Sequence, residues 1–288
     1  MKTLFLALAA LSISASAFAQ NKGDASNTAS GSGVGTTTGT LEGNPWDTQP
    51  SIVGGVKSYS DFGRQSEQTD PKSGRLVKSK NEFYLGAKSK SGWGAYAMGV
   101  EYGYAINENP VNGKHSGFTQ GDPSFSILHP VYDDGKVKIT GQFKQYFPVS
   151  DFSVSKNIWE QTYYSVLLWK MPRRFDFSNV LIPRYFSARN YAPGDTNFYT
   201  EDYTQVTYPV AKWMRVGLGQ HYQVEVHAAT PVGQTLEVFP MADFIIAPGV
   251  FAGPRVFFPV AVQNSVFDAP KSVNLNQAQP ELYIQATL

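Results

Sequence analysis

Polar and apolar residues alternate along the stretch KVKITGQFKQYFPV, residues 136–149. Val137 and Ile139 fall on one set of alternate positions, and Lys138 and Lys144 fall on the other. Successive side chains of a β-strand point to opposite faces, so this stretch is predicted to form a strand with one apolar and one polar face. Either a soluble protein core or membrane lipid could cover the apolar face.

The same pattern recurs along the chain beyond residue 50, where no segment has a convincing helical pattern. In residues 212–228, Leu218 and Val224 alternate with Arg215 and His221. Twelve segments are predicted to form strands: 51–60, 81–89, 93–105, 124–132, 136–149, 159–171, 179–190, 199–208, 212–228, 235–246, 250–262 and 280–288.

The connections between these segments differ in length in a regular order. Long or medium connections, such as 61–80 and 106–123, alternate with short ones that contain turn residues, such as Pro248 and Gly249. Every long connection therefore falls at the same end of the strands. Outer-membrane barrels have this asymmetry, whereas a soluble sandwich has no physical reason to sort its loops by end.

Strand length also separates lipid from a soluble core. Membrane strands need about 9–11 residues because they cross the bilayer tilted, whereas soluble strands average about 5–6. Most of the predicted strands are long, so we predict an all-β fold: a transmembrane antiparallel up-and-down β-barrel of about twelve strands, with short periplasmic turns and longer outer loops. Pro183, Pro240 and Pro259 fall inside predicted strands, and each removes a ladder hydrogen bond. They mark either bulges or incorrect strand boundaries, so the strand count around them stays open.

The first 19 residues have the features of a secretory signal peptide. Lys2 precedes a short apolar stretch, and Ala17 and Ala19 are the small residues that signal peptidase reads. The chain is thus predicted to consist of a signal peptide at 1–19, a flexible Gly/Ser/Thr-rich segment at 20–50 and a barrel at 51–288. The absence of cysteine excludes a lipid-modified lipoprotein and any disulfide.

The segment ELYIQATL at residues 281–288 is an amphipathic strand in which Leu282 and Ile284 alternate with Tyr283 and Gln285. In this feature the chain resembles bacterial outer-membrane β-barrel (porin-like) proteins. Members of that class usually end in Phe, which the outer-membrane assembly machinery reads, whereas this sequence ends in Leu288. The resemblance implies the cell outer membrane as the location. It also implies contact with outer-membrane lipid and with the assembly machinery through the last strand.

Composition supports this prediction and excludes other classes. The net charge of +1 provides no basic field for nucleic acid. Charged residues make up 16% of the chain, below the roughly 25% of soluble domains, and aromatic residues reach 14%. Aromatic residues near predicted strand ends are expected to form interfacial girdles. These are Tyr146, Phe147, Trp159, Tyr163, Tyr191, Tyr199, Tyr208 and Trp213.

The histidines predict neither a metal site nor a catalytic site. His221 and His227 share a strand face, but six residues at about 3.3 Å each put them about 20 Å apart, too far to share one ion. Outer-membrane lipases place a His and a Ser two positions apart, and no His-x-Ser triplet occurs here. We therefore expect no enzyme activity, no metal and no cofactor.

The polar rows of the strands are predicted to face the barrel lumen. Candidates for lining it are Lys138, Lys144, Arg215, His221, Glu225, Glu237, Asp243 and Arg255. Their charges are mixed in sign, so strong ion selectivity is not predicted. The sequence predicts a porin-like channel for passive diffusion of small solutes. Two alternatives stay open: a closed outer-membrane barrel whose outer loops bind a partner or surface, and a soluble exported β protein.

Overall fold

The computed structural model describes residues 52–62, 76–89, 94–107, 117–188, 190, 195–227, 233–263 and 278–287. The predicted signal peptide at 1–19 and the predicted flexible segment at 20–50 lie outside these ranges, as do most of the predicted outer loops 61–80, 106–123 and 263–279. Within the described part, no helix is both long enough and apolar enough to cross a membrane.

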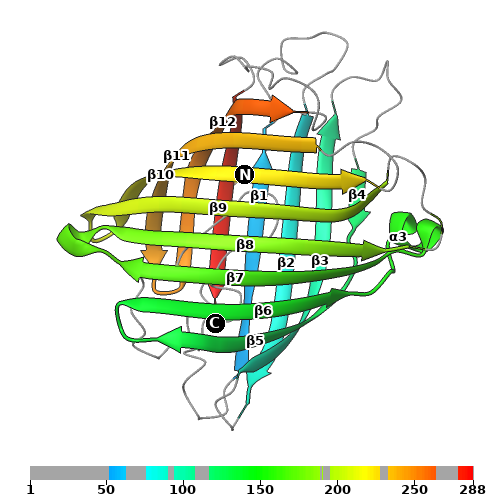
Figure 1. Ribbon diagram of the computed structural model, residues 1–288, viewed down its shortest axis with the longest axis horizontal. Helices are drawn as coiled ribbons and strands as arrows, with labels where there is room; N and C mark the ends of the chain where they lie inside the picture. Colours follow the sequence, from blue (N-terminus) through cyan, green and yellow to red (C-terminus); the bar gives the residue numbers. More distant parts are fainter. Residues whose placement is uncertain are drawn as a thin grey trace, which may run out of the picture.

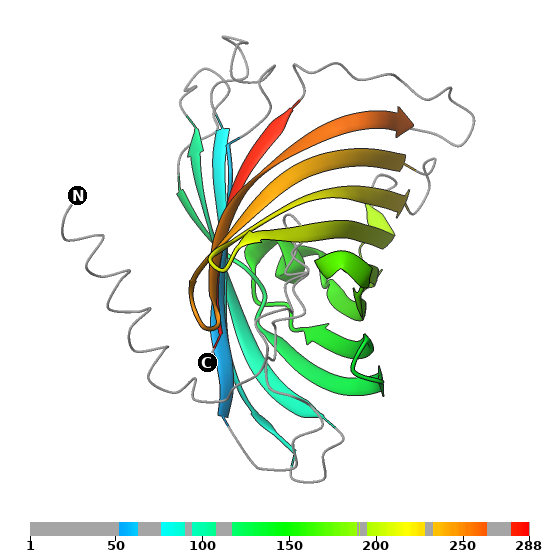
Figure 2. The ribbon, with the colours of Figure 1, turned by 90° about the vertical axis from the view of Figure 1, so that its left-hand side faces the viewer.

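Thirteen antiparallel strands form one sheet that curves round and closes on itself (Figures 1 and 2). They are β1 (Ile52–Asp61), β2 (Leu76–Lys88), β3 (Ala95–Asn107), β4 (Gly117–Gln120), β5 (Ser124–Asp133), β6 (Val137–Tyr146), β7 (Trp159–Lys170), β8 (Asp176–Ser187), β9 (Thr196–Ala211), β10 (Met214–His227), β11 (Gly233–Ala247), β12 (Val250–Gln263) and β13 (Gln279–Thr287). The pairing of β1 with β13, where Gly55 lies opposite Thr287, completes the circle. All twelve predicted strands are present, so the predicted all-β barrel is confirmed.

The thirteenth strand, β4, is the outer part of an interrupted wall strand. β4 pairs with β3 between Tyr102 and Ala105, and β5 pairs with β3 between Ala95 and Gly99. Residues 121–123 separate β4 from β5. Because β4 and β5 share one position beside β3, the wall of the barrel is twelve-stranded.

The connections that the structure describes contain two short helices, although no helix was predicted. α3 (Asp151–Lys156) follows β6, and the 3-10 turn η3 (Pro172–Arg174) follows β7. The Ser150 side chain caps α3 by accepting a hydrogen bond from the backbone N–H of Ser153. A helix of six residues is too short to leave a recognisable helical period in the sequence, which explains why the pattern did not predict it.

The connections are sorted by length between the two ends of the barrel, as predicted. Residues 212–213 alone join β9 to β10, and residues 248–249 alone join β11 to β12. At the opposite end, residues 62–75 join β1 to β2 and residues 264–278 join β12 to β13. β1 begins and β13 ends at the end with the short turns, which is the periplasmic end in barrels of this kind.

The three prolines singled out in the sequence, Pro183, Pro240 and Pro259, each disturb the ladder with one neighbouring strand. Pro183 of β8 lies opposite Thr200 of β9 but has no paired residue on β7. Pro240 of β11 likewise pairs with β10 and not with β12. A register shift accompanies Pro259 of β12, which confirms a bulge at that position.

The two faces of the wall are the reverse of those of a soluble protein. Large apolar side chains are exposed on the outside, including Leu85 at 61%, Leu218 at 62% and Ile246 at 64%. Charged side chains such as Lys57 and Arg255 are buried on the inside. The outer face therefore suits the hydrocarbon of a bilayer, and the closed sheet leaves no strand edge unpaired in lipid.

Candidate functional site

The lumen of the barrel receives most of the side chains predicted to line it. Six of these side chains are buried: Lys144, Arg215, His221, Glu237, Asp243 and Arg255. Lys138 and Glu225 are half-buried. The eight residues do not converge on one centre, and most of them divide among three groups of contacts.

The first group, the lysine cluster, joins Lys57 of β1, Glu82 of β2 and Lys144 of β6. Lys144 Nζ lies 2.5 Å from one Glu82 carboxylate oxygen, and Lys57 Nζ lies 3.8 Å from the other. All three side chains are at most 4% exposed. β3 and β5 stand between β2 and β6 in the wall, so the Lys144–Glu82 ion pair spans part of the lumen instead of following the wall.

Tyrosines reinforce the interior, which corrects part of the predicted aromatic girdle. The Tyr146 hydroxyl accepts a hydrogen bond from Lys144 at 3.1 Å and lies 3.4 Å from a Glu101 oxygen. The guanidinium of Arg184 lies 5.6 Å from the centre of the Tyr199 ring. Placement of Tyr146 and Tyr199 in a girdle was therefore wrong, because both lie beside inward-facing charges.

The outward part of the girdle follows the prediction more closely. Trp159 and Trp213 are exposed at strand ends, at 41% and 58%. Tyr191 lies outside the described residues.

The second group, the histidine cluster, surrounds His221 of β10. Its Nδ1 lies 3.0 Å from a Glu237 oxygen, and its Nε2 lies 3.4 Å from a Glu201 oxygen. The Tyr203 ring stacks on the imidazole with ring centres 4.0 Å apart. An Arg184 guanidinium nitrogen lies 2.7 Å from Glu201. The cluster thus links β8, β9, β10 and β11 on the inner face of the wall.

The third group, the Arg255 cluster, lies on β11, β12 and β13. The Arg255 guanidinium lies 3.9 Å from the centre of the Tyr283 ring, and its Nη1 is 3.6 Å from a Glu281 oxygen. The Tyr283 hydroxyl donates a hydrogen bond to Asp243. All four side chains are at most 4% exposed. As in the other two groups, each charge has a partner of opposite sign or an aromatic ring beside it.

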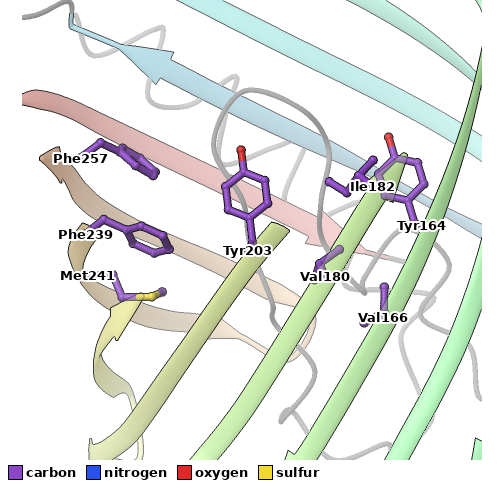
Figure 3. Packing of buried hydrophobic residues seen from close by; sticks show 8 residues of the cluster. All are labelled: Tyr164, Val166, Val180, Ile182, Tyr203, Phe239, Met241 and Phe257. Carbon is purple, nitrogen blue, oxygen red and sulfur yellow. The ribbon is translucent and has the colours of Figure 1, made fainter. Parts of the chain in front are cut away.

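An apolar lumen cluster lies among these charged groups. Its members come from β7, β8, β9, β11 and β12 and point into the barrel (Figure 3): Tyr164, Val166, Val180, Ile182, Tyr203, Phe239, Met241 and Phe257. Each is at most 5% exposed. The interior is consequently filled on this side by side chains that pack on one another.

Several charged residues of the lumen were missing from the sequence prediction, among them Lys57, Arg184, Glu201 and Glu281. Lys57 and Arg184 share a strand face with apolar residues; Ile182, for example, is on the same face of β8 as Arg184. Because those apolar residues also face the lumen, the polarity of the alternate positions does not reveal which face points inward. A signal existed for Glu281, since it shares the polar row of Gln285.

Chemistry beyond ion pairing is sparse in the part of the chain that the structure describes. No three His, Asp or Glu side chains gather there closely enough to hold a metal ion. That the chain is not an enzyme, and that the assembly machinery binds β13, stay predictions.

A closed antiparallel wall, an apolar exterior, a polar and charged interior and turns sorted by end define the class of bacterial outer-membrane β-barrels. The chain is a transmembrane barrel of that class, and the outer membrane is its location.

Solved structures similar to this chain include three outer-membrane proteins, of which the first supports the fold. The COG4313 outer membrane channel from Pseudomonas putida F1 matches with a TM-score of 0.57 and 9% identity, over 82% of this chain and 95% of that one. The NanC porin matches with a TM-score of 0.45 and 10% identity, over 81% and 98%. The translocator domain of the autotransporter NalP from Neisseria meningitidis gives 0.40 and 10%, over 86% and 90%. No protein-family model and no curated protein sequence matches the chain.

Proposed function

We propose that this barrel is an outer-membrane channel whose lumen is constricted by paired charges, and that small solutes diffuse through it passively when those pairs separate. The observation that carries the proposal is the Lys144–Glu82 ion pair, which spans part of the lumen between β2 and β6, two strands that are not neighbours in the wall. An ion pair between flexible side chains can open without any change in the wall. A constriction of this type therefore acts as a gate.

The composition of the interior indicates what such a channel would select. Lys57 and Lys144 face Glu82, and Arg184 faces Glu201, so charges of both signs lie side by side in the lumen. A constriction of mixed sign gives less preference between cations and anions than a ring of like charges. The Pseudomonas putida structure that matches with a TM-score of 0.57 is named an outer membrane channel, which supports a channel by likeness of fold.

A second function is favoured by the apolar lumen cluster. Val180, Ile182 and Phe239 are fully buried inside the barrel, whereas the lumen of an open porin is lined by side chains in contact with water. This packing favours a barrel that stays closed and acts through its outer loops, which would bind a partner or surface.

Single-channel recording distinguishes the two functions. The purified full chain is placed in a planar lipid bilayer beside a Glu82→Gln, Lys144→Met double variant, which removes both charges of the ion pair. We expect small, brief current steps from the unaltered chain, and larger and longer steps from the variant, because the lumen loses its crossing contact. Phe83→Leu is the matched control, since Phe83 neighbours Glu82 and is exposed on the outer face.

The opposite result is also informative. If the folded protein and the double variant both stay silent in the bilayer, the gate proposal is wrong and the closed, loop-binding barrel is the better account.

A further inference from the structure

A group of polar side chains interrupts the apolar outer face of β8, β9 and β10, which run side by side across the near wall in Figure 1. We call it the outer polar patch, and its members are Asn179, Asp202, Thr204, Gln220 and Tyr222. Their direction follows from their neighbours. Val180, Glu201, Tyr203 and His221 are buried in the lumen, so the residues that alternate with them point outward.

The strand register makes the patch contiguous. Thr204 lies opposite Asn179 of β8 on one side and opposite Gln220 of β10 on the other. Asp202 lies opposite Tyr222. The five side chains therefore occupy adjoining positions on three neighbouring strands.

Hydrogen bonds within the patch hold Asp202 in a fixed position. Asn179 Nδ2 donates to Asp202 Oδ1 at 2.7 Å and to Thr204 Oγ1 at 2.8 Å, and Thr204 Oγ1 donates to Asp202 Oδ1 at 3.0 Å. The bonds that Asn179 and Thr204 donate to Asp202 both end on the same carboxylate oxygen, Oδ1. Within the described ranges no donor reaches Asp202 Oδ2, and Gln220, which lies opposite Thr204, is exposed and makes no hydrogen bond there. One acceptor and one amide donor thus face outward together.

The patch lies in the middle of the wall and not at its rim. On β9, Val206 and Tyr208 follow the patch toward the turn end, and Phe198 precedes it toward the loop end. On β10, Leu218 and Val224 flank it in the same way. Tyr208 lies six positions along β9 from Asp202. At about 3.3 Å per residue and a strand tilt of about 40°, this places Asp202 roughly 15 Å from Tyr208 along the membrane normal. The apolar belt of such barrels is about 25 Å tall.

Asp202 is exceptional among the outward residues. Apart from Asp133 beside the β5–β6 turn, no other charged side chain is seen on the outward rows of the strands in the described ranges. A charge on the lipid face at this depth destabilises a barrel, and a carboxylate oxygen without a donor adds to that cost. Lipid chains are therefore a poor covering for this part of the wall.

We propose that the outer polar patch is the contact surface of a homodimer, in which two copies of this chain meet face to face about a two-fold axis. Such an interface must be self-complementary, because the same residues face each other from both sides. The patch meets this condition, since Gln220 of each copy can donate to Asp202 Oδ2 of the other. The outward rows that are described offer no cation for Asp202, so amide donors are the available partners within the chain.

The membrane supplies the reason for association. Apolar side chains gain no hydrophobic free energy by leaving lipid for one another, whereas hydrogen bonds between polar side chains favour the association of transmembrane segments. Leu181 and Leu218, exposed at 41% and 62%, surround the patch and would exclude water and head groups from it. This inference does not depend on whether the lumen conducts.

Cross-linking in the intact outer membrane tests the contact directly, because the sequence contains no cysteine. Gln220→Cys is treated with a short bis-maleimide, and Val100→Cys serves as the matched control. Val100 points outward at 41% exposure from β3, which lies far from β10 in the wall. We expect a cross-linked homodimer from Gln220→Cys and none from Val100→Cys. Equal yields from the two, or products of Gln220→Cys with other proteins only, would overturn the proposal.

A second measurement separates loss of contact from loss of folding. Asp202→Leu removes the acceptor, and we expect the dissociation constant of the dimer in detergent, measured by sedimentation, to rise about ten-fold or more. Asp202→Asn keeps a hydrogen-bonding group, so its dissociation constant should lie between those of the unaltered chain and of Asp202→Leu. The barrel of Asp202→Leu should stay folded, because the substitution replaces a charge on the lipid face by an apolar side chain. If unaltered chain and Asp202→Leu both sediment as monomers, no homodimer exists.

Discussion

Close packing inside the lumen makes single residues on its wall sensitive to added volume. Gly219 of β10 lies opposite Phe239 of β11, and a Cβ placed on Gly219 would be 2.3 Å from the Phe239 ring. The ring belongs to the apolar lumen cluster and is fully buried, so an added methyl group would force the ring or its neighbours to shift.

We predict that Gly219→Ala lowers the free energy of unfolding by about 1–3 kcal/mol through overpacking. Urea titration of the barrel in lipid vesicles measures the change. Gly233→Ala is the control, since its added Cβ would be 3.8 Å from the Glu225 side chain, an ordinary contact. Equal effects of the two substitutions would show that the lumen has room to adapt.

For some residues the sequence predicted whether the side chain faces the lumen or the membrane, and for others it could not. In residues 136–149, Thr140, Gln142 and Lys144 are buried in the lumen as the alternation predicted. Residues 199–208 carry polar groups on both rows, such as Glu201 inside and Asp202 outside. Alternation therefore could not identify Asp202 as the residue that faces the membrane.

Among the elements, the short helix α3 is held by the carboxylate of Asp122 from another connection, and Lys156 at its C-terminal end also pairs with Asp195. Asp122 lies between β4 and β5 and accepts hydrogen bonds from the backbone N–H groups of Val149 and Ser150, at 2.9 and 2.7 Å, and from the Ser153 hydroxyl. Partial burial raises the pKa of Asp122, but these hydrogen bonds outweigh burial and hold the pKa below its ordinary value of 3.8.

A depressed carboxyl pKa means that the contact stabilises α3 fully above about pH 3.8 and is lost as the pH falls through the lower, folded-state value. We predict that a nitroxide on Val154→Cys, an exposed helix position, is immobile at neutral pH and gains mobility in strong acid. Electron paramagnetic resonance records this change. In Asp122→Asn the mobility should be higher at neutral pH and should not respond to acid. A response in Asp122→Asn equal to that of the unaltered chain would assign the effect to another group.

Strands were predictable as elements, but their cross-lumen partners were not. Period-two alternation gives the face of a residue such as Lys144. It gives neither its height nor its angular position round the barrel, both of which depend on tilt and register. The Lys144–Glu82 pair requires all three, so only the closed structure reveals it.

At the scale of the whole molecule, a closed barrel has no strand edge at which a denaturing detergent can begin to unravel the sheet. We predict that the protein sediments with outer membranes and migrates faster in SDS gels before boiling than after it. Recovery of a folded monomer from the soluble fraction without detergent would exclude the membrane fold altogether.

The seam between β1 and β13 has a consequence for biogenesis. Residue 55 pairs with residue 287, near the two ends of the described chain, and contacts so distant in sequence form late because a long loop must close first. No length of nascent chain that lacks β13 can seal the wall. Until that strand is delivered, β1 and β12 expose their backbone groups to any other extended polypeptide. The final strand thus sets the moment at which the polypeptide ceases to be an aggregation hazard.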